Sequence, residues 1–198
     1  MSGSPERSPA VTPDALLDLL RSRRVVRNYA PGTLDVEQLQ MIAEAGTWAS
    51  SASNNRVHRF LVLRDSARMQ MVKKMSPGIY SIPAAMIVIC TDLRVAERVQ
   101  LQLTKDPSVW IDVGTAAMTM MLQAHALGLG SCPATSFSTS GVAVLLDLPP
   151  HARPDFILQV GHRRDSVVAL PARPGSSNAP RVARFVYWEM YGHEHPTP

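Results

Sequence analysis

The sequence is poor in cysteine and has no long uninterrupted apolar segment. Its two cysteines, Cys90 and Cys132, are too few for a disulfide framework and do not have the spacing of a zinc site. We therefore expect free thiols and a reducing, cytoplasmic location. The N-terminal residues are polar, which predicts no secretory signal. The longest apolar segment is interrupted by Asp112, Gln123 and His125, which argues against a helix that crosses a membrane.

Strong charge of either sign is also missing. The 20 basic and 16 acidic residues leave a net charge of +4, which is mild for 198 residues. Proteins that bind nucleic acid usually carry basic stripes with interleaved aromatic residues, so we predict no nucleic-acid partner. The 45% hydrophobic content is typical of a globular protein. We predict one domain over residues 13–192, after a disordered leader at 1–12 and before a polar tail at 193–198.

The common catalytic and nucleotide-binding motifs are absent as well. The sequence contains no G-x-G-x-x-G after a strand, no P-loop, no H-E-x-x-H and no G-x-S-x-G. Its six histidines are scattered, and we predict neither a metal site nor a catalytic side chain. This pattern is expected when a bound cofactor supplies the reactive atom.

One apolar stretch, residues 110–137, dominates the sequence. Its first part predicts a helix over about 108–127, whose apolar residues point in almost every direction. A helix of this kind is buried in a core, in a subunit interface or in lipid, and the polar interruptions argue against lipid. Gly128 and Gly130 predict the end of the helix, because glycine adopts a positive φ at low cost. A short strand is expected within 131–137.

The remaining periodicity predicts more helices than strands, and the strands are separated irregularly. Helices are expected from 13 onward, from 35 to about 48, over 66–75, across the charged segment 92–105 and from about 138 to 146. Strands are expected over 60–63, 85–91 and 156–160. The sequence has no internal repeat, which excludes the solenoid and propeller architectures.

Three polar stretches are candidates for binding a ligand. Arg23, Arg24 and Arg27 could hold a phosphate, because guanidinium groups match phosphate oxygens, or they could form a solvated basic face. The loop 49–55 could bond to the edge of a polar ring system, or it could be an ordinary surface loop. The segment 133–136 could leave backbone N–H groups free where its strand ends early. None of the three stretches is specific alone.

Together the stretches resemble the nitroreductase family of flavin enzymes. The resemblance rests on R-R-V-V-R-N-Y at 23–29, S-S-A-S-N at 50–54, D-V-G at 112–114, A-H-A-L-G-L-G-S-C-P at 124–133 and V-G-H at 160–162. It covers about residues 14–192. It implies an α+β fold with three α-β-α layers, in which helices surround a central mixed or antiparallel sheet, and an interlocked homodimer with two FMN molecules at the interface.

The same resemblance implies an activity and the residues that support it. Hydride would pass from NADH or NADPH to flavin N5, and then to a small organic acceptor such as a nitroaromatic or a quinone, in a ping-pong reaction. The implied cofactor-binding residues are Arg23, Arg24 and Arg27 at the phosphate and ribityl chain, Ser51 and Asn54 at the flavin shared with the other subunit, Pro133, Ala134, Thr135 and Ser136 along the ring, and Arg181 (or, less closely, Arg173) near the phosphate. The Thr135 N–H would point at N5.

Several positions depart from the family pattern. Val25 stands where the family usually has serine, and Arg56-Val57-His58 stands where it commonly has Gln-Pro-Trp. Ser50 replaces a proline, Thr135-Ser136 replaces a common Glu-Gly or Gly-Gly, and Gly161-His162-Arg163 replaces a frequent Gly-Tyr-Pro. These departures predict a substrate pocket unlike that of the nitroaromatic-reducing members. They leave two alternatives open: a homodimer that binds or sequesters flavin without efficient NAD(P)H turnover, and a structural dimer that has lost flavin.

Overall fold

The computed structural model describes residues 11–103, 106–164, 186–187 and 191. The chain divides into two compact units, Met1–Asp165 and Ser166–Pro198. In the second unit the rings of Tyr187 and Tyr191 lie 4.6 Å apart at 55°. The first unit contains the sheet and the helices described below. The predicted limits of the leader, the domain and the tail stay predictions.

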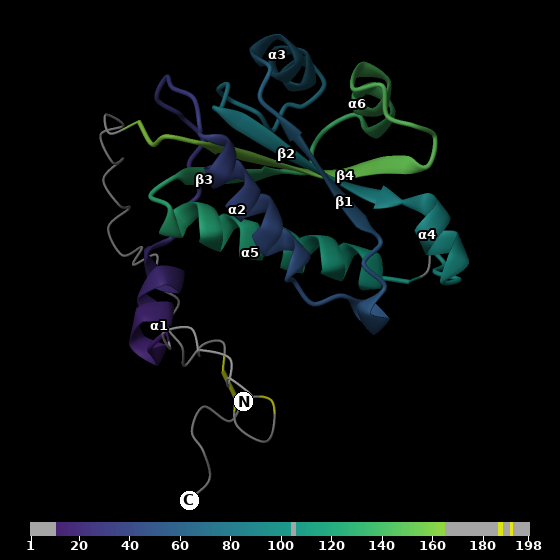
Figure 1. The fold of residues 1–198 in the computed structure, drawn as a ribbon, viewed down its shortest axis with the longest axis horizontal. Helices are drawn as coiled ribbons and strands as arrows, with labels where there is room; N and C mark the ends of the chain where they lie inside the picture. The colour runs from purple at the N-terminus through teal and green to yellow at the C-terminus, as the bar shows by residue number, and fades with distance from the viewer. Residues whose placement is uncertain (1–10, 104–105, 165–185, 188–190, 192–198) are drawn as a thin grey trace, which may run out of the picture. The chain divides into compact units, whose positions relative to one another are not determined.

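A four-stranded antiparallel sheet forms the centre of the first unit, in the order β1-β2-β4-β3 (Figure 1). The strands are β1 (His58–Leu63), β2 (Ala85–Asp92), β3 (Gly130–Ala134) and β4 (Ala152–Gly161). β2 and β4 are buried along nearly their whole length because helices cover both faces of the sheet. β1 and β3 are the two edge strands, so the segments that follow or adjoin them lie on opposite edges.

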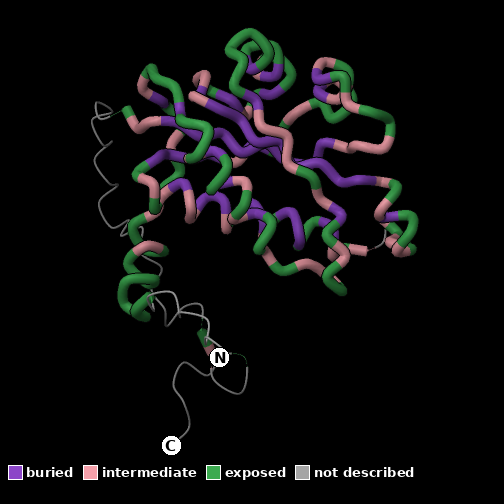
Figure 2. Tube along the Cα trace, viewed as in Figure 1, coloured by how far each residue is buried: buried purple, intermediate pink, exposed green. Residues whose placement is uncertain are grey.

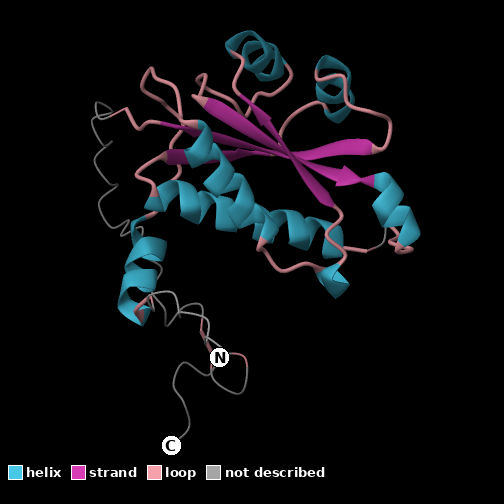
Figure 3. Cartoon of the chain, in the orientation of Figure 1, coloured by secondary structure: helices cyan, strands magenta, loops and turns pink. Residues whose placement is uncertain are grey.

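Strict alternation along β2 builds two cores. Ala85, Ile87 and Ile89 point to the face covered by α2 (Val36–Thr47) and α5 (Ser108–Ala126). Met86, Val88 and Cys90 point to the face covered by α3 (Ser66–Lys74) and α6 (Thr139–Leu145). Figures 1 and 3 show this α-β-α arrangement, which confirms the predicted α+β fold.

α5 ends as the sequence predicts. Gly128 has φ +75°, its N–H donates to the His125 carbonyl at 2.9 Å, and the Leu129 N–H donates to the Ala124 carbonyl at 2.9 Å. This pair of hydrogen bonds is the Schellman arrangement, and it reverses the chain directly into β3.

The predicted all-round burial of α5 is not reached within one chain. Its inner side packs on the sheet through residues such as Val113, Ala117 and Met120. Its outer side leaves Trp110 53%, Ile111 60% and Met118 44% exposed. The three large apolar side chains therefore remain available for another protein surface.

α1 (Pro13–Ser22) forms where Thr12 and Pro13 predict it, and the Thr12 hydroxyl accepts from the Ala15 N–H at 3.2 Å. Its expected apolar face is not covered by the rest of the described chain: Leu16, Leu17 and Leu20 are 40–48% exposed. α1 packs against α5, and its last residue, Ser22, contacts His125 near the C-terminal end of α5. Figure 2 shows most of α1 as exposed.

The helix predicted across 92–105 is wrong in length. α4 spans only Leu93–Arg98, with the Asp92 carboxylate accepting from the Arg94 N–H at 3.1 Å. Gln100 has φ +57°, a left-handed conformation that a continuing helix cannot contain. Charge composition suggested a longer helix, but the backbone turns after two helical turns. No helix among the described residues is long and apolar enough to span a bilayer.

Candidate functional site

The arginine-rich segment after α1 lies along the β3 edge of the sheet. We call residues 23–30 the N-terminal strap. Val25 pairs with Ser131 in a parallel bridge, and the Val26 N–H donates to the Ser131 carbonyl at 2.9 Å. Farther along, the Ala30 N–H donates to the His162 carbonyl at 3.0 Å. The strap therefore crosses the start of β3 and the end of β4.

The strap approaches β3 closely because Gly130 has no side chain. A Cβ at Gly130 would lie 2.7 Å from the Val26 Cβ, inside the van der Waals limit. The glycine pair that ends α5 thus has two tasks: Gly128 turns the chain, and Gly130 makes room for the strap.

Gly130→Ala is expected to push the strap away from the sheet edge. Overpacking of this kind lowers the free energy of unfolding by about 1–3 kcal/mol, and it should also move the strap arginines. Chemical denaturation of this variant beside Gly78→Ala provides the measurement, because a Cβ at Gly78 meets its nearest neighbour at an ordinary 3.5 Å. Equal stability of the two variants would contradict the proposed close contact.

The strap arginines carry positive charge that no acidic side chain neutralises within the described residues. The ion pairs of the described chain all use Asp92 or Asp155, and none includes a strap arginine. Arg23 Nη1 is buried and has no hydrogen-bond partner among the described residues. Arg27 is exposed, and its charge partly offsets the rise that burial causes in the pKa of Cys132. A buried guanidinium nitrogen without a described partner favours an anionic ligand.

His125 lies beside the strap at the end of α5. Its Nε2 is 2.8 Å from the Ser22 Oγ, and Arg163 Nη2 donates to its Nδ1 at 2.8 Å. Arg163 follows β4, and its backbone pairs with Tyr29 of the strap. Sequence reasoning missed this arrangement, because His125 was considered as a polar interruption of the apolar segment. The signal available in the sequence was Arg163, which stands where the family frequently has proline and could have indicated a further basic group at this site.

The end of β3 presents free backbone donors, as the sequence suggests. β3 stops at Ala134, Thr135 and Ser136 are exposed, and neither of their amides donates a hydrogen bond within the described chain. Thr135 and Phe137 line a cavity of about 460 Å³. The other lining residues are Trp110, Val113, Gly114, Thr139, Asp155 and Phe156.

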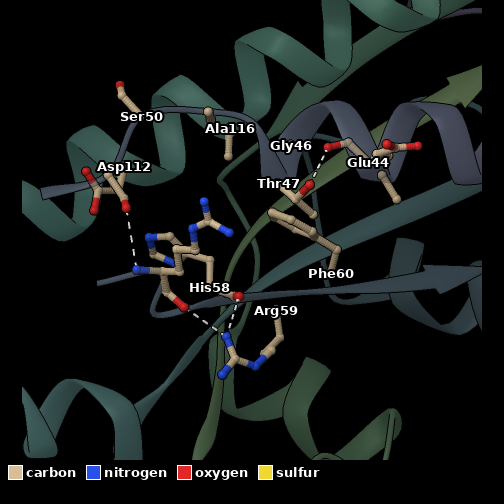
Figure 4. A pocket seen from close by; sticks show the side chains of 13 residues that line it. Glu44, Gly46, Thr47, Ser50, His58, Arg59, Phe60, Asp112 and Ala116 are labelled. Carbon is tan, nitrogen blue, oxygen red and sulfur yellow. Dashed lines mark hydrogen bonds between the residues drawn. The ribbon is translucent and has the colours of Figure 1, made fainter. Parts of the chain in front are cut away.

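Ser51 and Asn54 lie in the loop between α2 and β1. Both Asp112 carboxylate oxygens accept from the Ala52 N–H at 3.1 Å, which fixes this loop on α5. Asn54 is exposed with φ +54°, and its Oδ1 accepts from Arg56 Nε at 3.1 Å. Ser51 lines a cavity of about 430 Å³ between α2, β1 and α5 (Figure 4), together with Glu44, Thr47, Ser50, Arg56, His58, Arg59, Phe60, Asp112 and others.

A buried polar cluster lies beside His58, one of the residues that line this second cavity. The Thr91 hydroxyl donates to Asp155 and lies 3.4 Å from His58 Nδ1, and Arg153 Nε donates to Asp155 at 2.7 Å. Burial lowers the pKa of His58, against the opposing effect of the Asp112 and Asp155 carboxylates. Burial therefore favours the neutral imidazole. Sequence reasoning named His58 only as a departure from the family loop.

The predicted binding residues fall into two groups within one chain. The strap and 133–136 share the β3 edge, whereas Ser51 and Asn54 lie in the loop that leads into β1, the opposite edge strand, which is three strand spacings or about 14 Å from β3. Along α5, Asp112 beneath the Ser51 loop precedes His125 by 13 residues, or about 20 Å. Arg181 and Arg173 lie outside the described residues.

Comparison with known proteins decides the family. The sequence profile of the Nitroreductase family matches residues 20–86 and 71–162, most of the chain. The chain belongs to the nitroreductase family. A protein of Methanothermobacter thermautotrophicus whose name includes NAD(P)H nitroreductase is 25% identical over 155 residues, which cover 74% of this chain and 76% of that protein. The Bacillus subtilis protein named FMN reductase [NAD(P)H] is 27% identical over 170 residues, covering 78% and 68%.

Solved structures agree with this assignment at the level of the fold. The FMN-dependent nitroreductase of Clostridium difficile superposes with a TM-score of 0.71 at 23% identity, covering 88% of this chain and 99% of that one. NfrA1 of Bacillus megaterium superposes with a TM-score of 0.65 at 25% identity, covering 75% and 66%. Family membership confirms the prediction that this nitroreductase-family protein is a flavin-dependent NAD(P)H oxidoreductase.

Proposed function

We propose that this nitroreductase-family protein works as a homodimer that binds FMN and passes hydride from NADH or NADPH to a small organic acceptor of the nitroaromatic or quinone type. The observation that carries the proposal is the β3 edge. One end of this edge gathers arginines with unmet donors, and the other end presents free backbone amides. These are the groups needed for a phosphate and for a polar ring, respectively.

The chain's residues fit FMN at the phosphate end. Arg23, Arg24 and Arg27 would hold the phosphate and the ribityl chain, because fixed guanidinium groups suit a dianion. Arg24 Nη1 is turned to the Arg21 carbonyl and to the Arg23 carbonyl at 2.9 Å. Arg23 Nη1 is left as the buried donor without a described partner, so Arg23 is the strongest candidate.

At the end of β3, backbone groups rather than side chains would contact the flavin ring. Pro133 to Ser136 would lie along the isoalloxazine, with the free Thr135 N–H donating toward N5. A backbone donor orients the ring and stabilises negative charge on it without introducing a competing acid. Bound FMN supplies the atom that accepts and donates hydride, so the chain needs no catalytic side chain of its own. Trp110 and Phe137 beside Thr135 would flank a planar acceptor.

The proposed site requires two subunits. In this proposal Ser51 and Asn54, which adjoin β1 on the edge of the sheet opposite the strap, contact the flavin of the other chain rather than the flavin of their own. A two-fold arrangement would bring them to the flavin of the other chain. The exposed apolar faces of α1 and α5 support this dimer, since six exposed large apolar side chains lie on these two helices. Burial of these side chains between two subunits would give α5 the all-round burial that its sequence predicts.

Absorption spectroscopy tests the proposal. The purified protein is expected to show a visible flavin band, or to gain one on addition of FMN, and anaerobic NADH or NADPH should bleach it. A flavin band that neither nucleotide bleaches would favour the alternative of a flavin-binding dimer without turnover. A colourless protein that does not take up FMN would contradict both.

A further inference from the structure

We infer that Arg163 is an additional ligand of the FMN phosphate, and that His125 is the positioning residue that aims it. The inference rests on the proposed FMN site. It concerns two residues outside the strap, and one of them, Arg163, stands where the chain departs from the family pattern. Arg163 follows the last strand, β4, and its backbone pairs with Tyr29 of the strap. The proposed phosphate site therefore draws one arginine from the end of β4 and the others from the strap.

The hydrogen bonds around His125 run in one direction. A guanidinium only donates, so Arg163 Nη2 must donate to Nδ1. The ring proton is then on Nε2 and is donated to the Ser22 Oγ, and the Ser22 hydroxyl in turn donates to the Leu19 carbonyl at 3.2 Å. The chain of donors ends on the backbone of α1. Each hydrogen bond in this chain has a fixed donor and a fixed acceptor, which sets the orientation of the Arg163 side chain.

This arrangement requires a neutral imidazole, and its surroundings provide one. Burial lowers the pKa of His125 first, and the positive charges of Arg163, Arg23 and Arg24 lower it further. The described groups packed around the ring include no carboxylate that would oppose this effect. A protonated ring could not accept from Arg163, so the neutral form holds the guanidinium in place.

The remaining donors of this cluster have no described partner. Arg163 Nε is buried without an acceptor, and so is Arg23 Nη1. Both guanidinium groups surround the same imidazole, and the uncompensated positive charge is costly unless an anion joins them. A phosphate monoester offers several acceptor oxygens and two negative charges. The geometry therefore assigns Arg163 and Arg23 to the same phosphate.

Comparing FMN with riboflavin separates a phosphate contact from a merely structural one, because riboflavin has the same ring and ribityl chain without the phosphate. Arg163→Ala is expected to lower the affinity of the flavin-free full-length protein for FMN about tenfold or more, the range of one charged hydrogen bond. The affinity for riboflavin should change less than twofold. Flavin fluorescence titration measures both. Arg164→Ala removes the same charge from the exposed neighbouring residue and should leave both affinities unchanged.

Variants of His125 test the positioning role. His125→Leu should weaken FMN severalfold and spare riboflavin, and His125→Gln, which keeps one acceptor and one donor, should recover part of the loss. Arg163→Gln replaces Arg163→Ala if the alanine variant folds poorly, since glutamine can still donate to Nδ1 but has no charge. It should show the same selective loss of FMN.

Each other outcome overturns the inference. Equal weakening of FMN and riboflavin would mean that Arg163 only ties β4 to α5. Unchanged FMN affinity in the Arg163 variants, with a loss in Arg23→Ala, would leave the proposed FMN site intact and remove Arg163 from it. A wild-type protein that binds neither flavin would contradict the proposed function itself, and the inference with it.

Discussion

Arg23→Ala combined with Arg27→Ala is expected to lower the affinity for FMN by about a hundredfold or more. Each charged hydrogen bond contributes on the order of 1.5–3 kcal/mol, and about 1.4 kcal/mol is a factor of ten. Arg23 provides a buried donor without a described partner, and Arg27 is an exposed cation on the same strap. Neither is part of an ion pair in the described chain, so their loss should leave folding nearly unchanged.

The control for this double variant removes the same charge elsewhere. Arg68 and Arg98 are exposed on α3 and α4, away from the β3 edge. Arg68→Ala with Arg98→Ala should keep wild-type FMN affinity, measured by the same fluorescence titration. If the strap variant and this control bind FMN equally well, the phosphate does not lie on the strap.

Ile111→Asp is expected to dissociate the dimer. Ile111 is 60% exposed on the outer side of α5, which also carries Trp110 and Met118. The proposed interface buries this side. Burying an isoleucine side chain contributes about 1.5–3 kcal/mol, and two-fold symmetry applies the loss twice. Desolvation of the new carboxylates adds to this cost. The dimer dissociation constant should therefore rise at least about a hundredfold, as measured by sedimentation velocity over a range of concentrations.

Val144→Asp is the matched control. Val144 is 82% exposed on α6, which covers the other face of the sheet. The same change of an exposed β-branched residue to aspartate should leave the dimer intact there. Dissociation by both variants, or by neither, would show that the outer face of α5 is not the interface. Because the proposed flavin site is shared, Ile111→Asp should also release FMN.

The parts of the fold that depend on local signals could be predicted from the sequence. The apolar run of β2 reads as a buried strand, and alternation along it decides which residues meet which helix layer. Gly128 marks the end of α5 because only a residue tolerant of positive φ fits there. The same reasoning located the free amides after β3, since Pro133 cannot donate to a ladder and the strand ends one residue later.

Other features depend on which segments meet in space, and local signals do not contain that information. His125 on an apolar helix resembles a core residue until α1 and the end of β4 are placed beside it. The leucines of α1 have the spacing of a buried face, but within the described residues Leu16, Leu17 and Leu20 remain 40–48% exposed. The segment after Asp92 has the composition of a helix, yet a left-handed Gln100 ends it early.

A mixed dimer tests the central claim, a flavin site shared between two subunits, most directly. One subunit carries Arg23→Ala and Arg27→Ala, and the other carries Ser51→Ala and Asn54→Ala. In a shared site the mixed dimer has one site damaged on both sides and one site fully wild type. It should therefore bind one FMN per dimer with wild-type affinity, whereas both parent homodimers bind weakly. If each site belongs to one chain, both sites of the mixed dimer are damaged, and the absence of any wild-type site would contradict the account.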